Sequence, residues 1–319
     1  MAGIMQKLPT QRFRPGLAYL SSGLLALLSL TACGGDALDP VAYEAAVMEW
    51  REDRLARLRS ETGYLNLAGL YWLEPGESSF GGADGNDLVF PVTDTPTIGR
   101  FVLSDDGVQL IPADGVDIRY EGIPVRALRM SDDTSDNPVT VQHGRLAWGV
   151  IKREGRYGVR LRDLEHPAIF GSPPLEYFPV NPDYRVIATL DRFEEPRVLN
   201  LDTVVEGLGW APESPGMLQF ELAGESYELE AYSSDDRLFV VFADRTSGEE
   251  TYPAGRFVYA DGPAENGRTV LDFNLAYSPP CAFNDFSTCP IAAPGNRLPV
   301  SIAAGEKYSP EQHTAAQAH

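Results

Sequence analysis

Polar side chains of the types that perform acid–base chemistry gather between Asp244 and Lys307. They stand among apolar residues in the order Asp244, Arg256, Asp272, Asn274, Tyr277, Asn284, Arg297 and Glu306. Asp272 and Asn274 are two residues apart, so on a strand their side chains would face the same side. A buried carboxylate needs a partner, and Arg256 or Arg297 could supply one.

Two interpretations of this polar stretch stay open. In the first, the side chains line a cleft in which Asp272 acts as a general acid or base, assisted by Tyr277 and Arg256. A polar ligand would then be held by Asp244, Asn274, Asn284, Arg297 and Glu306. In the second, the same groups form a buried network that pins a long irregular loop and binds no ligand.

Familiar catalytic and metal-binding motifs are absent from the sequence. It has no Gly-x-Ser-x-Gly, His-Glu-x-x-His or Cys-x-x-Cys motif and no phosphate-binding glycine loop. His143 and His166 are the histidines in the region predicted to fold, and each precedes a turn-forming residue. Acidic runs at 84–87 and 132–136 are typical of solvated turns. We therefore expect no metal site and no cofactor.

The first 33 residues have the layout of an export signal. A basic start precedes the apolar run 17–30, which is shorter than the roughly 20 residues that span a bilayer. Leu30-Thr31-Ala32-Cys33 then resembles the bacterial lipobox, which implies that Cys33 carries acyl chains such as palmitate and begins the mature protein. An ordinary signal peptide and an uncleaved anchor are the alternatives.

Gly34, and not aspartate, follows the lipobox cysteine. By resemblance to Gram-negative sorting rules, this implies the outer membrane, with the protein facing the periplasm or the cell surface. Residues 34–39 would then form a short tether. We therefore expect a cell-envelope protein whose membrane partner is reached through a lipid anchor.

The acidic composition limits the partners further. The 319 residues carry 26 Lys+Arg against 46 Asp+Glu, a formal charge of −20. Loss of residues 1–33 removes three basic residues and no acidic one, which changes the charge to −23. This charge argues against nucleic-acid binding, because phosphate backbones need positive side chains. It also opposes contact with anionic lipids, so acyl chains would have to hold the protein at a membrane.

Two of the three cysteines, Cys281 and Cys289, remain once Cys33 is assigned to the lipid. Export would place them in an oxidising compartment, which favours a disulfide between them. The small loop that it closes would stabilise the fold by about 2–3 kcal/mol in the loop-entropy model. A pair of free thiols, or a redox-active or nucleophilic Cys281, remain the alternatives.

Turn signals and short apolar runs predict a mainly β fold. Asp39-Pro40 is typical of a helix start, and apolar spacing continues to about Arg59. After Gly63, short β-like runs alternate with turns as far as Phe273, a pattern typical of sandwiches and barrels. We expect a helix and a small sandwich-like region over 40–150. A β-barrel or sandwich with a long Pro/Cys loop should follow over 151–308, and a disordered tail over 309–319.

The same C-terminal region carries a family resemblance. Its most specific segments are Asp244–Phe257, Val270–Asn284, Asn296–Pro299 and Ala304–Lys307. They resemble the uncharacterised prokaryotic family named domain of unknown function 1684, and the likeness is dense from about Arg160 to Lys307. Ser278 stands where that family usually has asparagine. The resemblance implies membership of the family but no settled activity.

Two functions are compatible with these observations. The first is a binding or structural module of the envelope that engages a glycan, a peptidoglycan fragment, another polar small molecule or an envelope protein. The second is a hydrolase with an acid–base site around Asp272. A concave pocket formed by the polar side chains would favour a ligand or an enzyme, whereas paired and sealed groups would favour a structural network.

Overall fold

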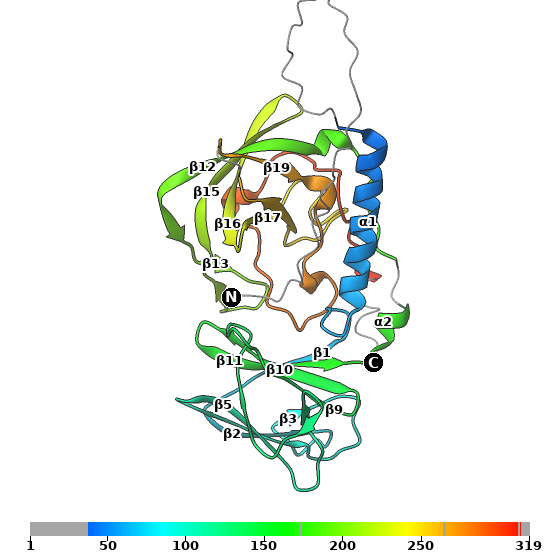
Figure 1. Ribbon diagram of the computed structural model, residues 1–319, viewed down its shortest axis with the longest axis vertical. Coiled ribbons are helices and arrows are strands. Elements are labelled where there is room, and N and C mark those ends of the chain that lie inside the picture. Colours follow the sequence, from blue (N-terminus) through cyan, green and yellow to red (C-terminus); the bar gives the residue numbers. More distant parts are fainter. Residues whose placement is uncertain (1–37, 172–173, 264–265, 312, 314–319) are drawn as a thin grey trace, which may run out of the picture.

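The computed structural model describes residues 38–171, 174–263, 266–311 and 313. These residues form two β lobes, one above the other in Figure 1, and one long helix, so the fold is mainly β as predicted. The predicted signal with Cys33, most of the tether, and residues 312 and 314–319 of the tail lie outside the described residues. Within the described part of the chain, no helix is long and apolar enough to cross a membrane.

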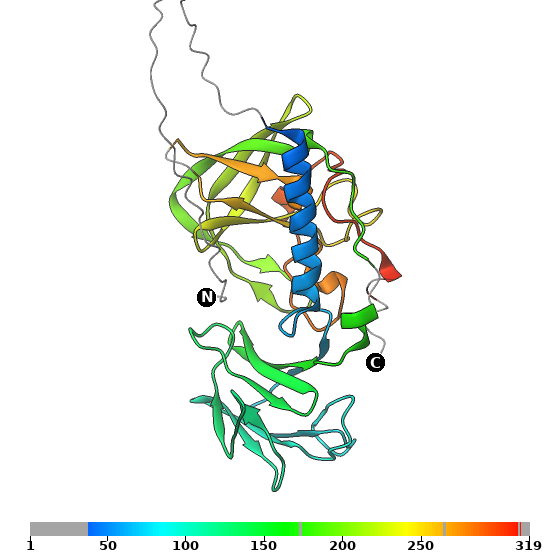
Figure 2. The same ribbon diagram turned by 45° about the vertical axis from the view of Figure 1, so that its right-hand side comes forward.

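The helix α1 (Pro40–Arg59) begins where the sequence predicted. The Asp39 carboxylate accepts hydrogen bonds from the backbone N–H groups of Val41 and Ala42, at 3.0 and 3.4 Å. Proline at the first helical position has no N–H that needs an acceptor. The Asp39 cap and Pro40 therefore both favour a helix start at this point. Figure 2 shows the helix lying along the side of the upper lobe.

The lower lobe is a sandwich of two sheets. The first has the strand order β1-β11-β10-β9-β6-β7 and the second β3-β2-β4-β5-β8. Their strands are β1 (Leu67–Trp72), β2 (Gly76–Gly81), β3 (Leu88–Val89), β4 (Gly99–Ser104), β5 (Gly107–Pro112), β6 (Arg119–Tyr120), β7 (Ile123–Pro124), β8 (Leu128–Met130), β9 (Thr140–His143), β10 (Leu146–Arg153) and β11 (Arg156–Asp163).

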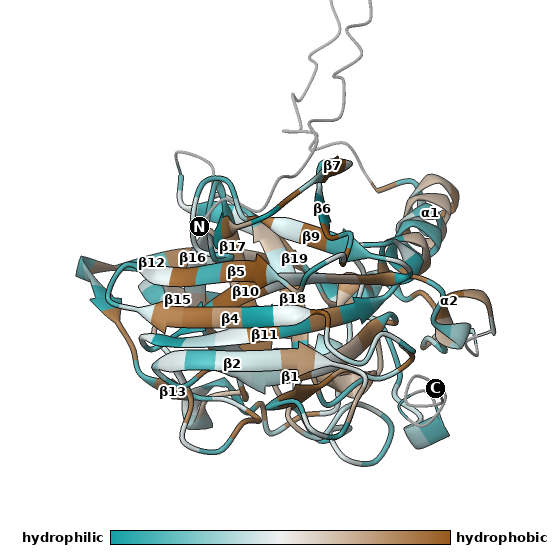
Figure 3. Ribbon diagram, turned by 90° about the horizontal axis from the view of Figure 1, so that it is seen from below, coloured by the Kyte–Doolittle hydropathy of each residue, from teal (hydrophilic) through white to brown (hydrophobic). Residues whose placement is uncertain are grey.

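Alternating side chains from both sheets fill the sandwich. Phe80 and Phe101 from one sheet and Trp148 from the other are fully buried against each other. Figure 3 views this lobe from below. In β4, buried Gly99 and Phe101 flank exposed Arg100, and in β5, buried Val108 and Leu110 flank exposed Gln109. The period of two is what a sheet with one buried face requires.

The upper lobe is built on a strongly curved sheet with the order β18-β17-β16-β15-β12-β19, beside the small hairpin β13-β14. Its strands are β12 (Arg185–Val198), β13 (Leu201–Asp202), β14 (Gly209–Trp210), β15 (Glu213–Leu222), β16 (Glu225–Ser234), β17 (Arg237–Phe242), β18 (Arg256–Asp261) and β19 (Arg268–Asp272). The edge strands β18 and β19 lie next to each other, and the Thr269 hydroxyl donates to the Asp261 carbonyl at 2.8 Å. The sheet is therefore a nearly closed barrel.

The division between the lobes differs from the predicted one. The expected boundary at 150–151 falls inside β10, because β10 and β11 form a hairpin through Glu154 and Gly155 and both belong to the first sheet. The short helix α2 (Pro167–Gly171) and the 3-10 helix η1 (Pro182–Tyr184) then lead to the barrel. The helix α1 precedes the sandwich in sequence but packs against the barrel (Figure 2).

Candidate functional site

The predicted polar side chains do not line one cleft. Most of them fall into three hydrogen-bonded clusters where the chain after β17 folds back against the barrel and α1. Each cluster contains one acid from the polar stretch, namely Asp244, Glu306 or Asp272, and we name the clusters after these acids.

The Asp244 cluster is a sealed ion pair. The Arg256 Nη2 atom donates to Asp244 Oδ2 at 2.7 Å, and both side chains are 0% exposed. Arg256 also donates to the backbone carbonyls of Ile302 and Ala304, while Thr246 donates its N–H and hydroxyl to Asp244 Oδ1. Burial lowers the pKa of Arg256, and Asp244 opposes that shift. The pair ties segment 302–304 to the first residue of β18.

The Glu306 cluster joins this C-terminal segment to α1. Arg54 Nε lies 3.3 Å from Glu306 Oε2, and Arg54 Nη2 donates to the Ser278 carbonyl at 2.9 Å. The Ser278 N–H donates to Glu306 Oε1 at 3.2 Å, and the Arg54 guanidinium lies over the Tyr277 ring. The Glu306 side chain is 0% exposed, and burial raises its pKa while Arg54 opposes the shift.

A glycine allows this close approach. Gly305 has φ +79°, and a Cβ atom there would lie 2.5 Å from the Ala276 carbonyl oxygen and 2.7 Å from that of Phe273. The next residue, Glu306, donates its N–H to the same Ala276 carbonyl at 2.8 Å. Only glycine fits at position 305, because a side chain there would clash with these carbonyls. Gly305 therefore lets Glu306 lie close to the Ala276 backbone.

The Asp272 cluster connects the end of β19 to the start of α1. The Tyr43 hydroxyl lies 2.9 and 2.8 Å from the two carboxylate oxygens of Asp272, and Arg185 Nε lies 3.8 Å from Oδ2. Asn274 donates its backbone and side-chain N–H groups to Asp272 Oδ1, at 3.0 and 3.1 Å. Burial raises the pKa of Tyr43, and the neighbouring Asp272 adds to the shift.

Asp272 and Asn274 meet for a different reason from the predicted one. The strand β19 ends at Asp272, and Asn274 lies in the 3-10 helix η2 (Phe273–Leu275). Asp272 is the N-cap of η2, so a capping hydrogen bond, and not strand alternation, brings the two side chains together.

The three residues suggested for catalysis are distributed over the three clusters. Tyr277 is half-buried among Trp50, Phe257 and Tyr259, and burial raises its pKa. Among the described residues, neither Tyr277 nor Arg256 forms a hydrogen bond or an ion pair with Asp272. The structure therefore does not assemble these three side chains into one site.

Arg297, another predicted ligand-binding residue, is exposed. Its neighbour Asn296 is the residue that forms buried hydrogen bonds with the barrel strands. The Asn296 side chain is fully buried and donates to the carbonyls of Glu230 and Val241, each at 2.9 Å. Its Oδ1 accepts the Glu230 N–H at 2.8 Å. The Asn296 amide thus pairs with both the N–H and the carbonyl of Glu230. A guanidinium could not replace it, because it has donors but no acceptor for the N–H group.

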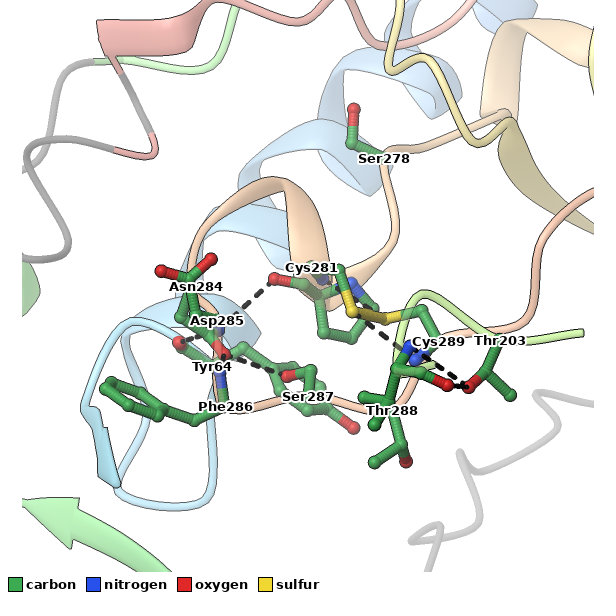
Figure 4. The surroundings of a disulfide bond; sticks show 12 residues. Tyr64, Thr203, Ser278, Cys281, Asn284, Asp285, Phe286, Ser287, Thr288 and Cys289 are labelled. Atoms are coloured by element: carbon green, nitrogen blue, oxygen red, sulfur yellow. Dashed lines mark hydrogen bonds between the residues drawn. A yellow bond between two sulfur atoms is a disulfide. The ribbon is translucent and has the colours of Figure 1, made fainter. Parts of the chain in front are cut away.

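Asn284 stabilises the loop that carries the cysteines. Its Nδ2 donates to the Tyr64 carbonyl at 3.0 Å, and its Oδ1 accepts the Ser287 hydroxyl at 2.9 Å (Figure 4). Tyr64 belongs to the link between α1 and β1, so Asn284 holds the loop against the junction of the lobes.

The predicted disulfide is confirmed. Cys281 and Cys289 are bonded, with their Cα atoms 6.2 Å apart, and both are buried beside Thr203 (Figure 4). This Cα separation lies in the usual range for disulfides, about 4.4–6.8 Å. The alternatives with free thiols do not describe this structure.

A cleft of about 540 Å³ opens beside the disulfide. Its aromatic walls are Tyr252 and Tyr308, whose rings lie 5.1 Å apart at 81°. Its apolar lining comes from Val204, Val205, Pro253, Ala254 and Cys281. Its polar lining comes from Asn284, Asp285, Ser287 and His313. The volume falls within the range of about 300–1,000 Å³ that is typical of small-molecule sites.

The titratable side chains that line the cleft are Asp285, His313 and the two tyrosines. His313 Nε2 lies 3.0 Å from the exposed carboxylate of Asp285. Burial raises the pKa of Tyr252 to about 12, and Tyr308 and Asp285 add to the shift. Burial also raises the pKa of Tyr308. Both phenols are therefore neutral hydrogen-bond donors at neutral pH.

Sequence reasoning identified only Cys281 and Asn284 among the residues of this cleft. Tyr252 and Tyr308 belong to the polar stretch or follow it directly, but nothing in their spacing indicates that they meet. His313 falls in the tail expected to be disordered, of which the structure describes residues 309–311 and 313. Among the described residues, no group of three or more His, Cys, Asp or Glu side chains is placed to hold a metal ion.

Comparison with known proteins places these features in a family. The model of the family described as "Protein of unknown function (DUF1684)" matches residues 173–307, which contain the barrel strands, the disulfide and the three acids that name the clusters. An uncharacterised protein from Haloarcula marismortui, solved by solution NMR, is 36% identical over 42% of this chain and 76% of its own, with a TM-score of 0.36. No curated protein matches the sequence. The chain therefore belongs to the DUF1684 family of proteins of unknown function.

Proposed function

We propose that this protein is a lipid-anchored module of the bacterial cell envelope that binds a glycan, such as a peptidoglycan fragment, in the cleft beside the disulfide. The lipid anchor is Cys33 and the membrane is the outer membrane. The observation that carries the binding function is the cleft itself, where two tyrosine rings meet above a loop held by the disulfide and by Asn284.

The chemistry of the cleft suits a sugar. A sugar ring has apolar C–H faces and a rim of hydroxyl groups, so it needs flat apolar walls and polar groups at the edge. Tyr252 and Tyr308 supply aromatic surface in two orientations. The exposed Asp285 carboxylate can accept hydrogen bonds from hydroxyl groups, and neutral phenols can donate to ring or glycosidic oxygens.

The geometry favours binding over hydrolysis around Asp272. A general acid or base must come within hydrogen-bond reach of its substrate. The Asp272 residue is 6% exposed, and its oxygens already accept hydrogen bonds from Tyr43 and Asn274 and lie near Arg185. Such a carboxylate is suited to fixing α1 on the barrel, and this is the role that we propose for it.

Replacing Tyr308 with alanine should weaken glycan binding by about tenfold or more, because a loss of about 1.4 kcal/mol of stacking corresponds to that factor. The measurement is calorimetric titration of the purified protein with a soluble tetrasaccharide from the peptidoglycan glycan strand. Tyr308 is the better choice than Tyr252, since Tyr252 also packs with the residues around the disulfide.

Tyr157→Ala is the matched control for this experiment, since Tyr157 is a half-buried tyrosine of the lower lobe. Its substitution should leave the affinity for the tetrasaccharide unchanged while it tests the general effect of losing an aromatic ring. Equal affinity of the Tyr308→Ala variant and the unchanged protein, or no binding by either, would rule out the glycan site.

Lipid attachment is tested separately. Cells that express the full chain and grow with radiolabelled palmitate should incorporate label into the protein, and a Cys33→Ala variant should not. The variant should also leave the membrane fraction, because a body of this acidity has no favourable attraction to anionic lipids. Label that persists in the Cys33→Ala variant would contradict the proposed anchor.

A further inference from the structure

Two arginines of β11 point away from the core of the sandwich. Val159 and Leu161 are fully buried in that core, so the alternation of the strand places Arg160 and Arg162 on the opposite face. Figures 1 and 2 show β11 on the side of the lower lobe that is turned towards the barrel. Arg162 Nη1 donates to the Gly63 carbonyl in the link from α1, which confirms this direction.

The cross-strand neighbours of Arg160 and the hydrogen-bond acceptors of Arg162 are uncharged. In the register of the sheet, Arg160 stands between Gly149 of β10 and Leu70 of β1. The acceptors of Arg162 are the Gly63 carbonyl and the side-chain oxygen of Asn66, both neutral. Burial, with repulsion from Arg160, lowers the pKa of Arg162 to about 10.

Arg160 is the less satisfied of the two. In the part of the chain that the structure describes, its guanidinium forms no hydrogen bond and no ion pair, and its Nε atom is buried without an acceptor. The Arg160 residue as a whole is half-buried, so part of it is open to solvent. Burial lowers the pKa of Arg160, and Arg153 adds to the shift while Tyr64 and Asp133 oppose it. The Asp133 carboxylate is already paired with Arg153 at 2.7 Å.

This arrangement contrasts with that of the two buried arginines, Arg54 and Arg256. Arg54 and Arg256 each have a carboxylate partner, Glu306 and Asp244. A desolvated positive charge next to a second one is unfavourable unless an anion compensates it. Arg160 and Arg162 thus lack the carboxylate partner that Arg54 and Arg256 have.

We propose that Arg160 and Arg162 bind a phosphate group of a small molecule at the junction of the lobes. Two adjacent guanidinium groups offer more than one fork of N–H donors, and a phosphate with three terminal oxygens and close to two negative charges can engage both. A carboxylate has two oxygens and one charge, which a single guanidinium satisfies. The site is separate from the cleft, whose lining includes neither arginine.

The test is titration of the full mature protein with inorganic phosphate at constant ionic strength, followed by calorimetry. Saturable binding is expected, and Arg160→Gln should weaken it by at least tenfold, because a charge-assisted bidentate contact is lost. Arg160→Lys should also weaken binding, since it retains the charge but not the planar fork. Arg160→Gln should remain folded by circular dichroism, because it removes no hydrogen bond or ion pair within the described residues.

Arg156→Gln is the matched control. Arg156 lies on the same face of β11, four residues away, but it is exposed and stacks over Trp72. Its substitution should leave phosphate affinity unchanged. The proposal is overturned if phosphate shows no saturable binding, if Arg160→Gln binds phosphate as well as the unchanged protein, or if acetate at equal ionic strength binds as tightly as phosphate.

Discussion

The Asp244→Ala variant should unfold with a free energy about 3–5 kcal/mol lower than that of the unchanged protein. The substitution leaves Arg256 with its charge but without its carboxylate, in a place where neither side chain is exposed. The Arg256 Nε atom already lacks a hydrogen-bond partner among the described residues, so no spare acceptor is at hand. Urea denaturation followed by tryptophan fluorescence measures the difference.

The control for this variant is an exposed ion pair of the same chain. Glu77 lies 3.4 Å from Arg100 on the surface of the sandwich, with side chains 65% and 45% exposed. Glu77→Ala should change the stability little, because solvent screens the pair. The double variant Asp244→Leu/Arg256→Met should recover part of the lost stability, since it removes the stranded charge. If Asp244→Ala lowers the free energy of unfolding no more than Glu77→Ala does, the Asp244 cluster does not stabilise the fold.

Arg54→Met should destabilise the protein by about 3–5 kcal/mol at neutral pH. Here the cation of a buried ion pair is removed and the acid, Glu306, is left without its partner. Methionine retains much of the apolar stem but removes the charge that faces Glu306 and the hydrogen bond to the Ser278 carbonyl. Because Arg54 is the contribution of α1 to the Glu306 cluster, we expect the helix to lose its protection against amide hydrogen exchange first.

The effect of Arg54→Met should depend on pH in a defined direction. Burial raises the pKa of Glu306 above its ordinary value of 4.5, and Arg54 limits that rise. A carboxyl group whose folded-state pKa is raised contributes stability below its unfolded pKa and loses that contribution as the pH rises through its folded pKa. Without Arg54 the shift is larger, so the stability gap between variant and unchanged protein should widen as the pH rises above the ordinary carboxyl pKa of 4.5.

The double variant Arg54→Met/Glu306→Gln serves as the control for this pH dependence. Glutamine cannot ionise, so the part of the gap that comes from Glu306 should disappear and the remaining difference should be nearly flat over the same pH range. A gap of constant size in the single variant would mean that Glu306 does not change its protonation in this range, and the assigned origin would be wrong.

Local signals in the sequence were sufficient for several features of the fold. Asp39-Pro40 marks the start of α1 because capping depends only on neighbouring residues. Cys281 and Cys289 are close in the chain, so a short loop brings them together without long-range information. The polar residues among apolar ones were predicted to need partners, and Asp244 with Arg256 confirms the reasoning for one pair.

The remaining partners could not be read from local patterns. Asp272 and Glu306 are paired with Tyr43 and Arg54, which are 229 and 252 residues away in the sequence. Arg297 lies close to these acids in the sequence and was predicted as a possible partner for a buried carboxylate, yet it is exposed. The same limit applies to the cleft and to the phosphate site, because both depend on which distant segments pack together.

The position of α1 also has a consequence for the order in which the chain is made. The helix leaves the ribosome before the sandwich, but Arg54 meets its acid only when Glu306 has been synthesised, 252 residues later. Contacts between such distant residues form late, because closing a long loop is costly in entropy. The Glu306 cluster therefore forms only after residue 306 has been synthesised, whereas the sandwich, whose strands end at Asp163, can form earlier.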